Sequence, residues 1–218
     1  MGTWALRTLR AAAGLIFVLL CLAVAAYAFA YLYGDFRPRN PFDRRFALAG
    51  LAVPAHLFGA GLALALAPLQ LWQGLRNRLP RAHRLVGWLY AFGVLIGGLG
   101  GLALAPNAHA GWASGAGFLL LALVWLATTG LGIGHAVAGR IGEHRRWMLR
   151  SVALTAAAIT LRLTLAVGQG ALHLPFATVY VFAAWSCWTV NLLAVELWLR
   201  RAGTVVRQHP AVSVAAAG

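Results

Sequence analysis

The sequence predicts an all-α integral membrane protein, a bundle of six transmembrane helices. Hydrophobic residues make up 61% of the 218 residues and charged residues only 10%, whereas soluble domains carry about 25% charged residues. The apolar residues also stand in long uncharged runs, and about 20 such residues cross a hydrocarbon core of roughly 30 Å. The runs are rich in Ala, Leu and Gly without polar–apolar alternation, so we expect helices and not the strands of a β-barrel.

Six apolar runs follow one another along the chain. We expect the helices at about residues 11–33, 46–75, 85–106, 111–139, 147–172 and 175–199. They would form one transmembrane domain over residues 1–201, followed by a short flexible tail over residues 202–218. The first run also resembles a signal peptide, with basic residues before it and Ala26-Tyr27-Ala28 as a cleavage-like motif. Its apolar stretch is longer than a signal peptide needs, so we interpret it as a membrane anchor.

The distribution of arginine predicts the orientation. The net charge of +14 would also suit a nucleic-acid-binding protein, but every basic residue is Arg and most lie on one side of a six-pass topology. That side holds Arg7, Arg10, Arg76, Arg78, Arg81, Arg84, Arg140, Arg145, Arg146, Arg150, Arg200, Arg201 and Arg207. The other side holds Arg37, Arg39, Arg44 and Arg45, diluted by Asp35 and Asp43. This positive-inside pattern places both termini in the cytoplasm and predicts no nucleic-acid partner.

Polar side chains within the predicted spans are costly and often functional. They are His56, Gln70, Thr128, Thr129, His135, Arg162, Gln169, Asn191 and Glu196. Arg162 lies about fifteen residues into the fifth run, near the bilayer centre, so it should face the bundle and meet an acceptor. That acceptor would be Asn191 or a bound anionic group, such as a propionate or a quinone oxygen. Glu196 and Arg150 lie at one level near the inner face and predict a structural ion pair.

Histidines at the inner helix ends suggest b-type haem. Two imidazoles from facing helices can bracket one haem iron. His83 and His144 lie at the inner ends of the third and fifth runs, among arginines that could neutralise propionates. They are the favoured axial ligands, with His135 as a substitute. A purely structural role for His135 is the simpler interpretation, because it ends a helix beside two glycines.

The remaining histidines lie elsewhere. His56 is about ten residues into the second run, where it would be a second ligand or a quinone contact, although no other membrane-embedded histidine matches its depth. His109 and His173 fall in the short outer loops, where hydrogen bonds to headgroups or backbone are the simpler expectation. Cys21 and Cys187 lie inside apolar runs and form no metal or disulfide motif. The sequence also shows no hydrolase or phosphate-binding motif.

Two stretches carry a resemblance to a family. They are residues 83–90 (HRLVGWLY) and residues 144–151 (HRRWMLRS), the second followed by Leu161-Arg162-Leu163. The other matching residues are His56, Gln70, Trp125, Trp185, Asn191 and Glu196. Over about residues 50–200 the chain resembles a bacterial multi-pass membrane family, the domain of unknown function twenty-three-oh-six. The resemblance implies the inner membrane of the cell and implies no activity, and the site residues it singles out are His56, His83, His144, Arg150 and Arg162.

These observations leave three hypotheses for the function. The leading one is a membrane protein that binds haem b in electron transfer or oxidase-linked haem handling, with a quinone or a respiratory-chain protein as partner. It draws on a loose similarity of the histidine layout to membrane b-type cytochromes and haem-handling proteins. The alternative is a non-enzymatic scaffold or accessory subunit, in which the His-Arg stretches join helix ends. A small-molecule transporter ranks last, because the two halves show no convincing inverted repeat.

Overall fold

The computed structural model describes residues 3–33 and 50–208, which are helical and contain no strand. The long helices are α1 (Thr3–Tyr33), α3 (Ala52–Leu71), α5 (Pro80–Leu104), α6 (Trp112–Val137), α7 (Ile141–Thr155), α8 (Ala157–Leu165) and α9 (Phe176–Gln208). Shorter elements are α4 (Gln73–Arg78), η1 (Ala105–Asn107) and the π-helical turn η2 (Ala166–Ala171). Six helices of the described part are long and apolar enough to cross a membrane, α7, α8 and η2 together counting as one. The predicted fold class is therefore confirmed.

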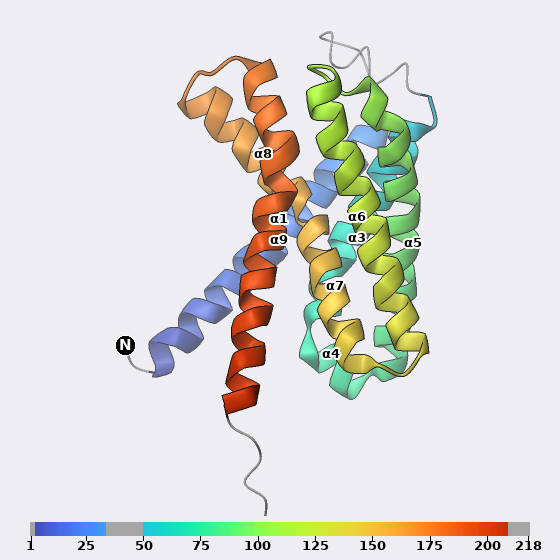
Figure 1. Ribbon diagram of the computed structural model, residues 1–218, viewed down its shortest axis with the longest axis vertical. Helices are drawn as coiled ribbons and strands as arrows, with labels where there is room; N and C mark the ends of the chain where they lie inside the picture. Colours follow the sequence, from blue (N-terminus) through green and yellow to red (C-terminus); the bar gives the residue numbers. More distant parts are fainter. Residues whose placement is uncertain (1–2, 34–49, 209–218) are drawn as a thin grey trace, which may run out of the picture.

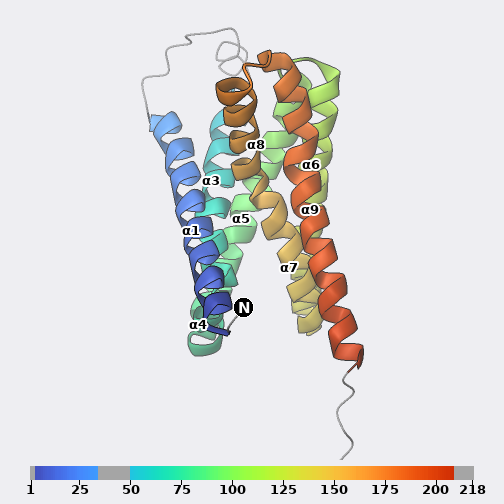
Figure 2. The ribbon, with the colours of Figure 1, turned by 90° about the vertical axis from the view of Figure 1, so that its left-hand side faces the viewer.

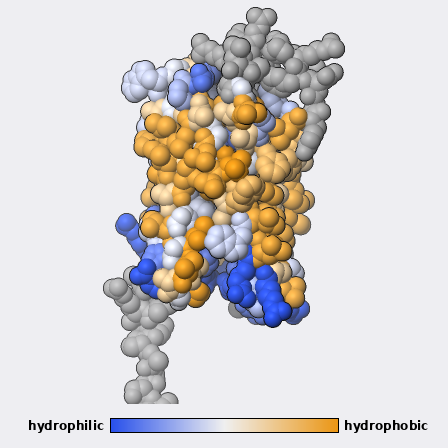
Figure 3. All heavy atoms as spheres, turned by 90° about the vertical axis from the view of Figure 1, so that its right-hand side faces the viewer, coloured by the Kyte–Doolittle hydropathy of each residue, from blue (hydrophilic) through white to orange (hydrophobic). Residues whose placement is uncertain are grey.

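The arginines gather at one end of the bundle (Figures 1 and 2). We call this the arginine-rich end; it carries Arg76, Arg78, Arg81, Arg84, Arg140, Arg145, Arg146, Arg200 and Arg201. The space-filling view shows hydrophilic side chains at this lower end and an apolar band above it (Figure 3). Such a band is what a hydrocarbon core requires of the surface that it touches. The predicted outer arginines, Arg37, Arg39, Arg44 and Arg45, lie outside the described residues.

Helices α3 and α5 touch backbone to backbone. A Cβ atom added to Gly59 would lie 2.2 Å from the Gly97 backbone nitrogen, and one added to Gly100 would lie 2.7 Å from the His56 backbone nitrogen. No side chain fits at these contacts, and small residues let membrane helices approach this closely. The glycines of the third span therefore fix α3, and with it His56, directly against α5.

A buried hydroxyl cluster joins α5, α6 and α7. The Tyr90 hydroxyl lies 2.7 Å from both Ser151 Oγ and Thr155 Oγ1. Trp125 Nε1 donates to Thr155 Oγ1 at 2.9 Å, and Thr129 Oγ1 lies 2.7 Å from Ser151 Oγ. All five residues are at most 6% exposed. In a membrane interior a hydrogen-bonded cluster of this kind holds helices together where the hydrophobic effect does not.

Two spans differ from their predicted course. The fifth was expected as one helix over residues 147–172, but it begins at Ile141 and breaks at Ala156, between α7 and α8. The sixth was expected to end at residue 199, but α9 continues to Gln208, into the segment that was expected to begin a short tail. Residues 209–218 lie outside the described part. The break matters for the site, because Arg162 lies on α8, beyond it.

Candidate functional site

A cavity of about 770 Å³ lies in the half of the bundle away from the arginine-rich end. Its walls come from α1, α3, α5, η1, α6, α7, α8, η2 and α9 and consist mostly of Ala, Leu, Gly and aromatic side chains. The polar side chains in its wall include His56, Arg162, Gln169 and Tyr180. An apolar cavity with a few converging polar groups is the usual form of a small-molecule or cofactor site.

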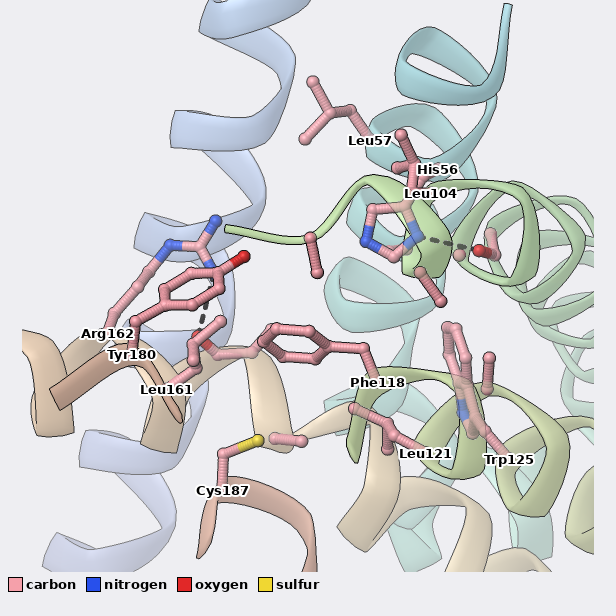
Figure 4. Close-up of a pocket in the computed structure, with 18 of the residues that line it drawn as sticks. His56, Leu57, Leu104, Phe118, Leu121, Trp125, Leu161, Arg162, Tyr180 and Cys187 are labelled. Atoms are coloured by element: carbon pink, nitrogen blue, oxygen red, sulfur yellow. Dashed lines mark hydrogen bonds between the residues drawn. The ribbon is translucent and has the colours of Figure 1, made fainter. Parts of the chain in front are cut away.

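His56 presents one ring nitrogen to this cavity. Its Nδ1 lies 2.8 Å from the backbone oxygen of Gly97 on α5. Because a carbonyl oxygen only accepts, Nδ1 carries the proton and Nε2 of the neutral ring keeps its lone pair. Figure 4 shows this second nitrogen facing the space shared with Arg162 and Tyr180. A metal-ligating histidine is held in the same way, by a hydrogen bond from its other ring nitrogen.

Arg162 brings a positive charge to the opposite wall. Its Nη1 donates to the Ala158 backbone oxygen at 2.8 Å, and its guanidinium lies 5.3 Å from the centre of the Tyr27 ring. The ion pairs found among the described residues involve other arginines, so this guanidinium faces the cavity without a carboxylate. A guanidinium has five N–H donors. Arg162 can therefore hold an anionic or carbonyl group within the cavity.

The expected contact between Arg162 and Asn191 is wrong. Asn191 Nδ2 donates to the Ala153 backbone oxygen at 3.1 Å, and its Oδ1 accepts from Thr160 Oγ1 at 3.0 Å. Both functional atoms of the Asn191 amide are thus engaged with the backbone and a hydroxyl of the fifth span. The similar depth of the two residues suggested the pairing, but the α8 side chain that contacts Asn191 is Thr160, while Arg162 donates to the Ala158 backbone oxygen.

The predicted haem ligands His83 and His144 lie at the arginine-rich end, far along the bundle from His56. His144 Nδ1 lies 2.8 Å from the Gly132 backbone oxygen, while Gln70 Nε2 donates to the His83 backbone oxygen at 3.2 Å. The Nδ1 atoms of His83 and His135 are buried and have no hydrogen-bond partner in the described structure. No group of three or more His, Cys, Asp or Glu side chains there could hold a metal ion. The predicted site residues therefore fall into two groups, one at each end.

Arg150 forms the predicted ion pair with Glu196. Nε contacts Oε1, and Nη2 donates to Oε2 at 3.1 Å, so the contact is bidentate. The guanidinium also lies 4.7 Å from the centre of the Trp147 ring. An anionic cofactor group would have to displace Glu196 to reach this side chain. The structural interpretation of the pair is thus the one that the contacts favour.

Sequence reasoning missed several residues of the cavity wall. Tyr27 and Tyr180 lie in apolar runs, where an aromatic side chain usually indicates nothing beyond core packing. His109, expected to meet headgroups or backbone, also lines the cavity, with its ring 4.9 Å from that of Phe176. Only the position of His109 could have indicated its place in the cavity wall. It follows the third span directly and so lies at the same end of the bundle as the start of the second span, which carries His56.

Fold and cavity together define a multi-pass helical membrane protein with an internal cavity. A family model described as "Predicted membrane protein (DUF2306)" matches residues 53–199, and the chain belongs to that family. The suspected family is thereby confirmed, and α1, with its cavity residue Tyr27, lies outside the match. Searches of curated proteins and of solved structures gave no match.

Proposed function

We propose that this protein binds a b-type haem in the cavity, with His56 Nε2 as axial ligand, and acts in electron transfer or oxidase-linked haem handling in the bacterial inner membrane. The observation that carries the proposal is the fixed His56 ring. Its Nδ1 is held by the Gly97 carbonyl and its other nitrogen faces an apolar cavity of about 770 Å³. Neutral imidazole oriented by a backbone carbonyl is a favourable iron ligand.

The other walls suit the same group. Leu121, Phe118 and Trp125 supply flat or branched apolar surface for a macrocycle. Arg162 supplies a positive charge for a propionate, and that anion would offset the cost of a guanidinium inside the membrane. A bound haem would supply the redox chemistry, while these residues set its orientation and potential. A quinone or a respiratory-chain protein is the partner we propose for the electron transfer.

The arginine-rich end is proposed as a second haem site. His144 repeats the arrangement of His56, because its Nδ1 is held by the Gly132 carbonyl at 2.8 Å. The Nδ1 atom of His83, at the same end of the bundle, is buried without a partner in the described structure. These contacts support His83 and His144 as ligands less strongly than the cavity supports His56, because neither residue lines that cavity.

Absorbance of the purified protein before and after dithionite tests the proposal. We expect a Soret band that shifts on reduction, that loses the contribution of the cavity haem in His56→Ala and that regains it when imidazole is added to this variant. The exposed His173 has φ 51°, so His173→Asn is the matched control and should keep the band. The absence of a Soret band from the wild type, even after reconstitution with haemin, would refute the proposal.

The scaffold function is the second candidate, and contacts at the arginine-rich end favour it. Gln70 joins the end of α3 to the start of α5, and His144 joins α7 to α6. In that case His144→Ala would lower the thermal stability in detergent and leave the absorbance spectrum of the wild type unchanged. Loss of a haem band in the same variant would instead assign His144 to a cofactor.

A further inference from the structure

We infer that Asn191 is a positioning residue of the cavity: it bridges the break in the fifth span and thereby directs Arg162 toward the ligand. The part of this inference that concerns the ligand rests on the proposed function. The part that concerns helix geometry does not. Asn191 lies on α9 and is not among the residues that line the cavity, so it acts through α8.

No proline or glycine accounts for the break in the fifth span. The stretch from Ile141 to Ala171 contains no proline, and none of its residues between Glu143 and Val167 is glycine. Yet α7 ends at Thr155 and α8 begins at Ala157. Kinks without proline or glycine arise where a side chain or a water enters the hydrogen-bond ladder. Within the span, Thr155 Oγ1 donates to the Ser151 backbone oxygen at 2.9 Å, a contact that often bends helices. A side chain from a neighbouring helix can then hold the bend in one geometry.

Asn191 is that side chain. Ala153 is one of the last four residues of α7, whose carbonyls lack partners in the next turn when a helix ends. Asn191 Nδ2 donates to the Ala153 oxygen at 3.1 Å, so a side chain of α9 replaces the missing intrahelical donor of this carbonyl. An unsatisfied carbonyl in the membrane interior would cost free energy. The amide donor therefore stabilises the broken helix relative to a continuous one.

The same amide also holds the other side of the break. Thr160 Oγ1, on α8, donates to Asn191 Oδ1 at 3.0 Å. One side chain thus contacts α7 through its donor and α8 through its acceptor. Two such contacts restrict how α8 can rotate against α7, because any rotation would lengthen one of them.

The rotation of α8 decides where the cavity's charge lies. Ala157, Ala158, Leu161 and Arg162 of α8 all line the cavity. The Ala158 carbonyl holds the Arg162 guanidinium at 2.8 Å, so the side chain follows the backbone of α8 closely. Asn191 therefore governs the recognition of an anionic group in the ligand, whereas it leaves the apolar walls from α3, α5 and α6 unchanged.

Binding of haemin and of its dimethyl ester, which lacks the two carboxylates, tests this inference. Asn191→Ala and Arg162→Ala should each weaken haemin binding about tenfold, and the double variant should lose no more than either single variant. Binding of the ester should be weakened less, because it keeps only the apolar contacts with α8. Thr189→Ala is the matched control, since Thr189 is exposed on α9 and donates only to Trp185 of its own helix at 2.7 Å. Additive losses in the double variant, or an equal loss for the ester, would overturn the inference.

Distances between two spin labels test the positions of the helices without any haem. Labels at Leu163→Cys on α8 and Leu99→Cys on α5, which are 51% and 52% exposed, would be measured in a background without Cys21 and Cys187. Asn191→Ala should shift or broaden the distance distribution. Thr160→Val, which removes only the α8 contact, should do so more weakly and serves if Asn191→Ala does not fold. If the wild type binds no haemin, the proposed function fails, and an unchanged distance distribution is then what overturns the positioning role.

Discussion

Replacing Gly97 by alanine tests the link between helix packing and the site. A Cβ atom at this position would lie 2.6 Å from the backbone nitrogen of Ala60, where ordinary contact begins near 3.4 Å. Because the obstructing atoms belong to the backbone of α3, no side chain can turn aside. The two helices must separate by about 0.8 Å, and overpacking of this kind costs about 1–3 kcal/mol of stability.

The same displacement reaches His56. Its Nδ1 lies 2.8 Å from the Gly97 oxygen, and a separation by the same amount would lengthen this contact to about 3.6 Å, beyond hydrogen-bonding range. The ring would then lose the contact that orients Nε2. Loss of such an orienting partner typically costs 10–100-fold in metal affinity. We therefore expect Gly97→Ala to lose both stability and haem affinity.

Two measurements check this expectation: the free energy of unfolding in mixed micelles, and a haemin titration followed by absorbance. Gly130→Ala is the matched control, because Gly130 also lies in a transmembrane helix and a Cβ added there meets nothing within 4 Å. It should equal the wild type in both assays. The reasoning would be refuted if Gly97→Ala and Gly130→Ala behaved alike, since the backbone contact would then be without consequence.

Three further predictions concern the polar groups of the spans. Tyr90→Phe should cost about 1–2 kcal/mol of unfolding free energy, because it removes two hydroxyl contacts at 2.7 Å. Each such contact is worth about 0.6 kcal/mol on average in membrane proteins. An unchanged unfolding free energy would contradict the role of the hydroxyl cluster. Arg162→Leu should raise thermal stability without ligand and weaken haemin binding, since it removes a membrane-embedded charge that has no carboxylate among the described residues; a lower melting temperature would show that Arg162 stabilises the fold. Glu196→Gln should cost about 1 kcal/mol of unfolding free energy, because Arg150 keeps a hydrogen-bond acceptor but loses its counter-charge; a loss equal to that of deleting Arg150 would contradict this.

Some features of the site follow from the sequence and some do not. The pairing of Arg150 with Glu196 could be predicted, because both residues lie about one turn from the same end of adjacent predicted spans. The pairing of Arg162 with Asn191 was predicted by the same logic of depth and is wrong. Depth predicts the level of a side chain in the membrane, whereas contact also requires the helix to be turned toward its partner. Asn191 meets Thr160 and Ala153 of the fifth span and not Arg162.

The sequence by itself determined the six spans, the arginine-rich end and the presence of a costly cation in the fifth span. These features depend on the composition and length of single segments, which the bilayer selects one helix at a time. Only the tertiary structure decided that His56 and Arg162 share a cavity, that His83 and His144 lie apart from them, and that Asn191 acts on α8. These features depend on how closely and at what rotation helices pack, and backbone contacts at glycines such as Gly97 set that rotation without any pattern that a single run of residues reveals.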